Sequence, residues 1–406
     1  MRSLLITVSV GIALVVAGCG RNNGAVTPDE TRPLRIAAPF VSQTTDFAFD
    51  AFRRINEQAA GDNVFYSPLS LHMALGMVLN GANGSTKTEL QKVLRLDGQT
   101  LTDANQTYAT LRQDLPAVDT QVKLQLANSV WYRNGFTVAP TFETVLRDTF
   151  NAQSAGLDFD SPAALAAING WANSNTNGLI SKVVDQIAPN EVLYLLNAIY
   201  FKGNWKTQFD PARTIDAPFT LTNGTTKSVR MMRLDAELRR AFRETYTAFE
   251  LPYGGGQTAM TVLLPKNGTT ADGLLGTFTP AEWTQLQTAM SSGKIDIGLP
   301  KFTLKTENKL QPVLSQMGMP TAFTDRADFT GINPNGGLLL TSVKQNAFVA
   351  VDEKGTEAAA VTTIGVGVTS APVPYICDRP FVFVIHEKGS GAILFMGKIS
   401  NPTTQP

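Results

Sequence analysis

The amino-acid sequence predicts an α+β protein in which helices pack against large antiparallel β-sheets. Two observations support this fold class: helical periodicity is strongest near the start of the chain, whereas most segments after about residue 215 alternate as strands do. Between residues 42 and 402 there is neither a second linker nor an internal repeat. We therefore expect one domain over 42–402 and a short tail over 403–406.

Three early segments have helical signals. Apolar residues recur at intervals of three and four from Phe47 to Ala59, which places them on one face of a helix. The dipeptide Ser67-Pro68 puts a capping hydroxyl before a first-turn proline, and predicts a second helix through about Asn80. The stretch 86–89, Thr-Lys-Thr-Glu, has the spacing of a capping box and predicts a short third helix.

Strands are predicted from two long segments and several later ones. Residues 122–132 alternate between apolar and polar side chains, with Asn128 as one polar interruption. The run "EVLYLLNAIYFKGNW" at 191–205 is almost continuously apolar apart from Asn197, which is typical of the buried centre of a sheet. The later strand-like segments are "FELPY", "TAMTVLLP", "KIDIGLPKFTL", "GLLLTSVKQNAFVAVDE" and the hairpin "FVFVIHEKGSGAILFMGKIS".

The first residues have the layout of a secretion signal. Arg2 precedes an apolar run from Leu4 to Val16, which is too short for a comfortable transmembrane helix. The run leads into Val-Ala-Gly-Cys, which resembles a bacterial lipobox. We interpret 1–18 as a lipoprotein signal peptide and Cys19 as the acylated residue; the alternative is an ordinary signal with an incidental cysteine. Residues 19–41, rich in Asn, Pro and Thr, are then expected to form a flexible tether.

This interpretation predicts a protein that is secreted across the inner membrane and held by a lipid rather than by a spanning helix. Gly20 stands where an Asp often signals retention in the inner membrane, which favours the outer membrane or the cell surface. If Cys19 is lipidated, only Cys377 remains, so no intrachain disulfide is available. The simplest role for Cys377 is that of a small buried apolar residue.

Composition argues against several functions. The 34 basic and 34 acidic residues balance to a formal net charge of zero, which removes the electrostatic footprint of a nucleic-acid-binding protein. Only His72 and His386 are available for histidine chemistry, and both lie in apolar segments where core histidines are the commoner case. The segment "GANGSTKTEL" lacks the glycine that precedes lysine in a Walker A motif. We expect no enzyme activity, no metal and no cofactor.

The segment "DEKGTEAAA", residues 352–360, resembles the reactive-loop hinge of inhibitory serpins. The resemblance continues through "NVFYSPLSLHMALGMVLNGANGSTKTEL", "LLNAIYFKGNW", "FELPYGGGQTAMTVLLP", "LPKFTLKTENKLQPVLSQMGMPTAFTDRADFTGI" and "RPFVFVIHEKGSGAILFMGKISNP", in the order the family has them. It implies the serpin fold, with helices packed on three β-sheets and an exposed reactive-centre loop. It also implies inhibition as a suicide substrate: a protease cleaves the loop, which then inserts into the large sheet and traps the acyl-enzyme.

The same resemblance assigns roles to individual residues. The hinge comprises Glu353, Gly355, Thr356, Glu357, Ala358, Ala359 and Ala360. The shutter and breach, where the sheet opens, comprise Ser67, Ser70, Asn197, Gln345 and Trp205. Many serpins have His at the position of Gln345. A glutamine here could still link Asn197 to Ser67 by hydrogen bonds, although it provides no titrating group.

The loop itself has a sequence that suits insertion. In a strand, alternate side chains share a face. The face that would point inward contains neither charge nor proline and comprises Thr356, Ala358, Ala360, Thr362, Ile364, Val366 and Val368. Glu357 falls on the opposite face. A plain flexible loop is the alternative, but such a loop has no reason to keep charge off one face.

Family spacing places the reactive bond at Thr369-Ser370, about ten residues before Pro380-Phe381. A small β-branched residue at the cleavage site fits a shallow elastase-like or subtilisin-like pocket better than a trypsin or chymotrypsin pocket. Cleavage could also occur at Ile364, Val366 or Val368.

We expect a monomer whose partner is a serine protease. Alternatives are inhibition of cysteine proteases, or a non-inhibitory serpin that acts as a binding or chaperone-like protein. The segment "LDGQTLTDANQTYATLRQDL" has no run of basic residues, so heparin binding is not expected.

Overall fold

The computed structural model describes residues 34–59, 61–356 and 374–403, all of which belong to one compact unit. The helices are α1 (Ala38–Gln58), α2 (Pro68–Asn80), α3 (Gly84–Val93), α4 (Leu101–Asp114), α5 (Pro140–Asp148), α6 (Pro162–Asn175), α7 (Ala271–Thr277), α8 (Pro280–Ala289) and α9 (Gln311–Met317). None of the helices in these residues is both long enough and apolar enough to cross a membrane.

The strands of the described residues form two hydrogen-bonded sheets. The larger sheet has the order β1-β15-β14-β8-β7-β6-β9-β13, with β5 paired to β6, and the smaller one has the order β10-β11-β12-β4-β2-β3. Their bounds are β1 (Val64–Tyr66), β2 (Val122–Arg133), β3 (Gln153–Leu157), β4 (Leu193–Asn204), β5 (Ile215–Thr220), β6 (Thr226–Phe242), β7 (Tyr246–Pro252), β8 (Thr258–Pro265), β9 (Ser291–Pro300), β10 (Phe302–Lys309), β11 (Lys344–Val351), β12 (Gly355–Thr356), β13 (Tyr375–Ile376), β14 (Phe381–Glu387) and β15 (Ile393–Ile399).

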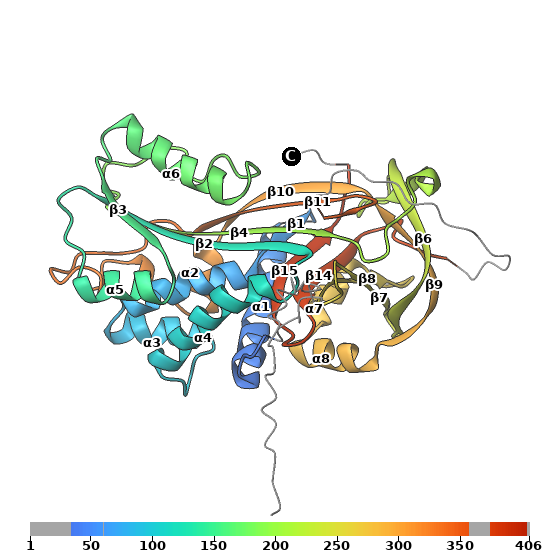
Figure 1. Cartoon of the computed structure of the whole chain (residues 1–406), viewed down its shortest axis with the longest axis horizontal. Helices are drawn as coiled ribbons and strands as arrows, with labels where there is room; N and C mark the ends of the chain where they lie inside the picture. Colours follow the sequence, from blue (N-terminus) through green and yellow to red (C-terminus); the bar gives the residue numbers. More distant parts are fainter. Residues whose placement is uncertain (1–33, 60, 357–373, 404–406) are drawn as a thin grey trace, which may run out of the picture. The chain divides into compact units, whose positions relative to one another are not determined.

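The six-stranded sheet lies between two helical layers (Figure 1). On one face, α2 and its neighbouring helices join the main apolar core, which also includes β14 and β15. On the other face, α6 covers a smaller cluster built around Trp131, Ile168 and Trp171. Along β4, Leu193 and Leu195 contact the main core, whereas alternate residues contact the α6 cluster. This sheet is therefore buried on both faces, which is why the sequence of β4 is almost continuously apolar.

The predicted α+β fold is confirmed, and the helix after Ser67 and the strands over 122–132 and 191–205 are present. The sheet count differs from the expected three, because β6 pairs with β9 along most of its length and with β7 at its end. The long strand β6 therefore makes one sheet where two were expected, which leaves two sheets among the described residues. Helices α4 to α9 were not predicted, although Thr279-Pro280, at the start of α8, carries the same cap signal as Ser67-Pro68.

Two boundaries also need correction. Helix α1 begins at Ala38, before the predicted domain start at residue 42, and Leu34 is buried in the core. The end of the predicted tether therefore belongs to the folded body. The capping box over 86–89 was wrong. Helix α3 begins at Gly84, so Thr86 lies inside it and its hydroxyl accepts a hydrogen bond from the backbone N–H of Asp328.

Candidate functional site

Between strands β4 and β11 there is room for one more strand, and only one end of this strand position is occupied. There, β12 pairs with β4 through Gly355 opposite Asn204, and with β11 through Thr356 opposite Val351. From residue 193 to residue 202, no strand among the described residues pairs with this edge of β4, although its other edge is paired with β2 throughout. We term this space the gap. An unpaired row of backbone N–H and C=O groups is a ready template for another strand.

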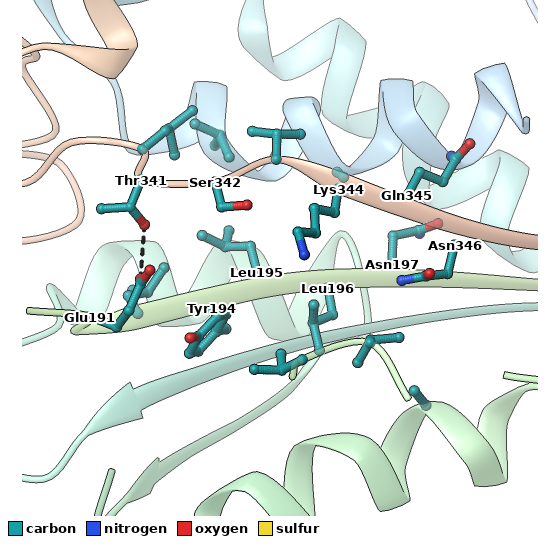
Figure 2. A pocket seen from close by; sticks show the side chains of 18 of the residues that line it. Glu191, Tyr194, Leu195, Leu196, Asn197, Thr341, Ser342, Lys344, Gln345 and Asn346 are labelled. Carbon is teal, nitrogen blue, oxygen red and sulfur yellow. Dashed lines mark hydrogen bonds between the residues drawn. The ribbon is translucent and has the colours of Figure 1, made fainter. Parts of the chain in front are cut away.

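The gap opens into a cavity of about 690 Å³ that passes between the strands. Figure 2 shows β4 on one side, with Leu195, Leu196 and Asn197, and the chain from Thr341 to Asn346 on the other. Residues of α2 line the cavity on the face of the main core, and Trp171 of α6 lines it on the opposite face. Most lining side chains are apolar. The cavity therefore suits an extended segment with small apolar side chains.

Helix α2 holds β11 at the shutter. Gln345 is buried, with 7% of its surface exposed, and makes two hydrogen bonds to the main chain of Ser67. Its Nε2 donates to the carbonyl oxygen of Ser67 at 2.9 Å, and its Oε1 accepts from the N–H of Ser67 at 2.9 Å. The Ser67 hydroxyl donates to the carbonyl oxygen of Leu394 and accepts from the N–H of Ser70, which caps α2.

The same helix holds β4 through a separate chain of polar groups. The Ser70 hydroxyl donates to Asn197 Oδ1, and Asn197 Nδ2 donates to Asn128 Oδ1 at 2.6 Å. Asn128 in turn donates to the carbonyl oxygen of Phe150 at 2.8 Å. The predicted direct link from Gln345 to Asn197 is absent among the described residues, because each side chain contacts α2 instead. The two strands beside the gap are thus joined through one helix.

Trp205 anchors the breach, where β12 ends the gap. Its Nε1 donates to the carbonyl oxygen of Asp352 at 2.9 Å, and its ring stacks on Tyr253 with centroids 4.4 Å apart. The hydroxyls of Tyr253 and Thr356 are 2.7 Å apart, and Thr356 is only 3% exposed. Burial raises the pKa of Tyr253, so its hydroxyl keeps its proton. Thr356 therefore has a satisfied polar position on the core side of the sheet.

The turn before Thr356 is built from charge and close packing. Burial opposes the ionisation of Glu353, but hydrogen bonds from Lys301 at 2.8 Å, from the backbone and from Thr214 outweigh it, so the pKa of Glu353 is lowered. A Cβ at Gly355 would lie 2.1 Å from the carbonyl oxygen of Gly203. Glycine is required there because the backbones of β12 and β4 approach so closely.

Several predicted site residues lie outside the described residues: Cys19, Glu357, Ala358, Ala359, Ala360, Thr369 and Ser370. Among those described, Ser67, Ser70, Asn197 and Gln345 meet at the shutter, and Glu353, Gly355, Thr356 and Trp205 meet at the breach. Sequence reasoning did not assign roles to Asn128 and Tyr253. A polar residue inside an apolar strand was the available signal for Asn128; Tyr253 had none.

The two histidines and Cys377 have structural positions. His72 Nε2 donates to the carbonyl oxygen of Leu94, and the Tyr108 hydroxyl donates to His72 Nδ1. His386 is also buried and contacts the Thr261 hydroxyl at 3.0 Å. Cys377 is buried, and burial raises the pKa of its thiol, which disfavours the reactive thiolate. Each of these side chains therefore belongs to the core, as the sequence predicted.

The six-stranded sheet has one open strand position, and the hinge is seated at the end of that position. This arrangement defines a protein class that can accept an added strand. The chain matches the family model for Serpin (serine protease inhibitor) over residues 42–402. Leukocyte elastase inhibitor from Sus scrofa is 34% identical over 377 residues, covering 88% of this chain and 98% of that protein. The chain therefore belongs to the serpin family.

Solved structures agree with this fold. The native state of tengpin, a thermophilic serpin, has a TM-score of 0.83 at 29% identity and covers 91% of this chain and 96% of its own. Human thyroxine-binding globulin complexed with thyroxine has a TM-score of 0.81 at 28% identity, covering 91% of this chain and 100% of its own. This chain therefore shares its architecture with both of these serpins.

Proposed function

We propose that the chain is a suicide-substrate inhibitor of serine proteases with elastase-like or subtilisin-like specificity. In this proposal the protease cleaves Thr369-Ser370 and is trapped as an acyl-enzyme when the freed loop fills the gap. The observation that carries the proposal is the pairing at β12, because it sets the register that an inserting strand would continue. The hinge already contributes Gly355 and Thr356 to the sheet.

Continuing this register matches the loop to the gap residue by residue. Position 358 falls opposite Phe201 and Val349, and position 364 falls opposite Leu195 and Val343. These four side chains belong to the main core or pack against it. Burying each Val or Ile of the inward set would contribute about 1.5–3 kcal/mol. New backbone pairing on both sides of the strand adds to this stabilisation.

The one polar position in the middle of the gap also finds a partner. The same register places position 362, a threonine, opposite Asn197 and Gln345 of the shutter. A threonine hydroxyl both donates and accepts, so it can replace hydrogen bonds that the shutter loses when the strands separate. On the other face, Glu357 falls opposite Lys202, where an ion pair can form. Polar and apolar positions therefore both favour this register.

A denaturing-gel experiment tests the proposal. A soluble form without the signal peptide and Cys19, residues 20–406, is mixed with an elastase and with subtilisin, and the released peptide is sequenced. We expect an adduct that resists denaturant, with a peptide beginning at Ser370. The variant Thr369→Arg should redirect adduct formation toward trypsin, because an arginine reaches an acidic specificity pocket. An adduct with unchanged specificity would place the reactive bond elsewhere.

The second candidate is a non-inhibitory serpin that binds a partner with the same fold. The similarity to the globulin complexed with thyroxine supports it. The two candidates give different gels, because a non-inhibitory serpin is cut cleanly and leaves no adduct. Clean cleavage by every serine and cysteine protease tried would favour the second candidate.

We also propose that Cys19 carries a lipid that holds the protein at the outer membrane or cell surface. The support is the short apolar run that ends in Val-Ala-Gly-Cys. Expression of the full chain and of Cys19→Ala, followed by membrane fractionation, tests it. We expect the wild type in the membrane fraction and the variant in the soluble extracytoplasmic fraction. Retention of the variant would contradict lipid anchoring.

A further inference from the structure

A hydrogen bond between described residues crosses the gap at the end far from the breach. Thr341, in the extended segment that leads into β11, donates from Oγ1 to Glu191 Oε2 at 2.8 Å. Glu191 lies two residues before β4. Figure 2 shows this bond spanning the cavity between the two sides. It therefore connects the two segments that must separate if a strand fills the whole gap.

Both ends of this bond are fixed to the rest of the protein. The Arg133 guanidinium donates to the carbonyl oxygens of Glu191 and Pro189, at 3.2 and 3.1 Å, and the Arg133 N–H donates to the carbonyl oxygen of Val192. On the opposite side, the N–H of Leu340 donates to the carbonyl oxygen of Ala322. Because neither side is a loose loop, the bond holds the gap at a defined width.

The bond also lies on the path of the last inserted residues. The register set at β12 places position 366 opposite Leu193 and Thr341, and position 368 opposite Glu191. Directly opposed residues of antiparallel strands share a face, so these positions would use the side on which Thr341 and Glu191 meet. A strand that ends at position 364 would stop before it reaches Thr341 and Glu191.

We propose that the Thr341–Glu191 hydrogen bond is a latch that divides strand insertion into two stages. The inference rests on the proposed function. Residues 357–364 can pair with β4 and β11 while the latch is closed. Residues 366–368 displace the latch, so its rupture limits completion of the strand. The latch thereby restrains full insertion until a cleaved loop supplies the whole segment.

A second contact across the gap can be separated from the latch. Lys344 Nζ lies 3.7 Å from Asp185 Oδ2 and 3.3 Å from Glu307 Oε1. Position 363 falls opposite Lys344, on the face away from the main core. A strand therefore meets this ion pair before it reaches Thr341. A peptide that ends at residue 364 therefore meets only the Lys344 contact, whereas a peptide that ends at residue 369 meets both contacts.

Peptide binding to the uncleaved mature protein tests the latch. Fluorescent peptides with the sequences of residues 357–364 and 357–369 are added to the wild type, Thr341→Val and Ser342→Ala, and association rates are measured. We expect Thr341→Val to speed binding of the long peptide roughly threefold to tenfold, the range that a net hydrogen bond corresponds to. It should leave the short peptide unchanged. Ser342→Ala removes the neighbouring hydroxyl, which has no partner among the described residues, and should behave as wild type.

A second variant guards against an indirect effect of Thr341→Val. Glu191→Ala should speed the long peptide by a similar factor, and the double variant should be no faster than either single one, because both remove the same bond. Equal long-peptide rates in wild type, Thr341→Val and Glu191→Ala would overturn the latch while leaving the proposed function intact. Failure of wild type to bind either peptide would overturn both, because the gap would then not accept a strand.

Discussion

Thr356 has the environment of a residue that already belongs to the sheet. Its hydroxyl meets that of Tyr253, and its backbone pairs with Gly203 and Val351. Tyr253 is itself held by stacking on Trp205. The side chain that begins the loop is therefore positioned by the preceding strand and by two distant parts of the chain, around residues 203–205 and at Tyr253. A small neutral residue is what this position accommodates.

If the proposed function holds, replacing Thr356 with arginine should convert the protein from an inhibitor into a substrate. Thr356 is buried beside the Tyr253 hydroxyl, and burying an unpaired guanidinium there would cost at least several kcal/mol. The measurement is the ratio of adduct to cleaved protein on a denaturing gel. Ala359→Arg is the matched control, because the proposed register puts position 359 on the opposite face and leaves Glu357 opposite Lys202. Full inhibition by Thr356→Arg would contradict the assignment of faces.

His72 is a neutral core residue whose titration affects stability. Burial lowers its pKa from 6.5 to about 4, even though the hydrogen bond to the Leu94 carbonyl oxygen favours the charged form. The unfolded chain therefore takes up a proton at a higher pH than the folded chain does. The stability this residue contributes is fully present above pH 6.5 and is lost as the pH falls toward 4.

We expect His72→Gln to reduce the pH dependence of the free energy of unfolding in this range. The lowered pKa corresponds to about 3 kcal/mol between pH 6.5 and 4. Denaturant unfolding of wild type and variant at several pH values measures the difference. His386, whose pKa is also lowered to about 4 by burial, titrates in parallel, and His386→Gln provides the comparison. Parallel stability curves for wild type and His72→Gln would refute the assignment.

At the scale of the element, α2 is the part that joins the two sides of the gap. Its first turn is bonded to β11 through Gln345 and to β4 through Asn197. The strands can separate only if at least one of these connections breaks. A glutamine makes its connection equally strong at every pH, since it does not titrate.

Gln345→His should make the shutter sensitive to acid. A neutral imidazole can accept a hydrogen bond from the Ser67 N–H, whereas a protonated one cannot accept it and carries a buried charge. The variant should therefore open more readily as the pH falls below about 6.5. The rate of long-peptide binding at pH 8 and pH 5.5 measures this. A pH effect no larger than in wild type would show that the Gln345 connection does not limit opening.

At the scale of the whole molecule, the open edge of β4 leaves the sheet incomplete. Its backbone groups lack strand partners over most of its length among the described residues, while apolar side chains line the space beside it. Filling the gap would pair these groups and bury further apolar surface. The uncleaved fold is therefore expected to be less stable than the same chain with a strand in the gap.

Cleavage of the loop between residues 357 and 373 should raise the thermal unfolding midpoint. The expected increase is at least about 5 °C, because in a domain of this size each kcal/mol of added stability raises the midpoint by only about 1–1.5 °C. Calorimetry before and after limited cleavage by a protease that is not trapped measures it. Thr356→Arg should show a smaller increase, because its loop inserts poorly. An unchanged midpoint in the wild type would argue for the non-inhibitory candidate.

The sequence by itself determined the family, the α+β class, the helix after Ser67, the two central strands and the core histidines. These features follow from local patterns: cap residues, periodicity and ordered motifs are readable within a few turns of chain. The tertiary structure decided which polar groups meet. Thr86 and Glu89 seemed to cap a helix, but they bind Asp328 and Thr321 instead. Gln345 binds Ser67 rather than Asn197, and Thr341 reaches Glu191, 150 residues away. A side chain's hydrogen-bond partner depends on which distant segments pack together, and no local pattern records that.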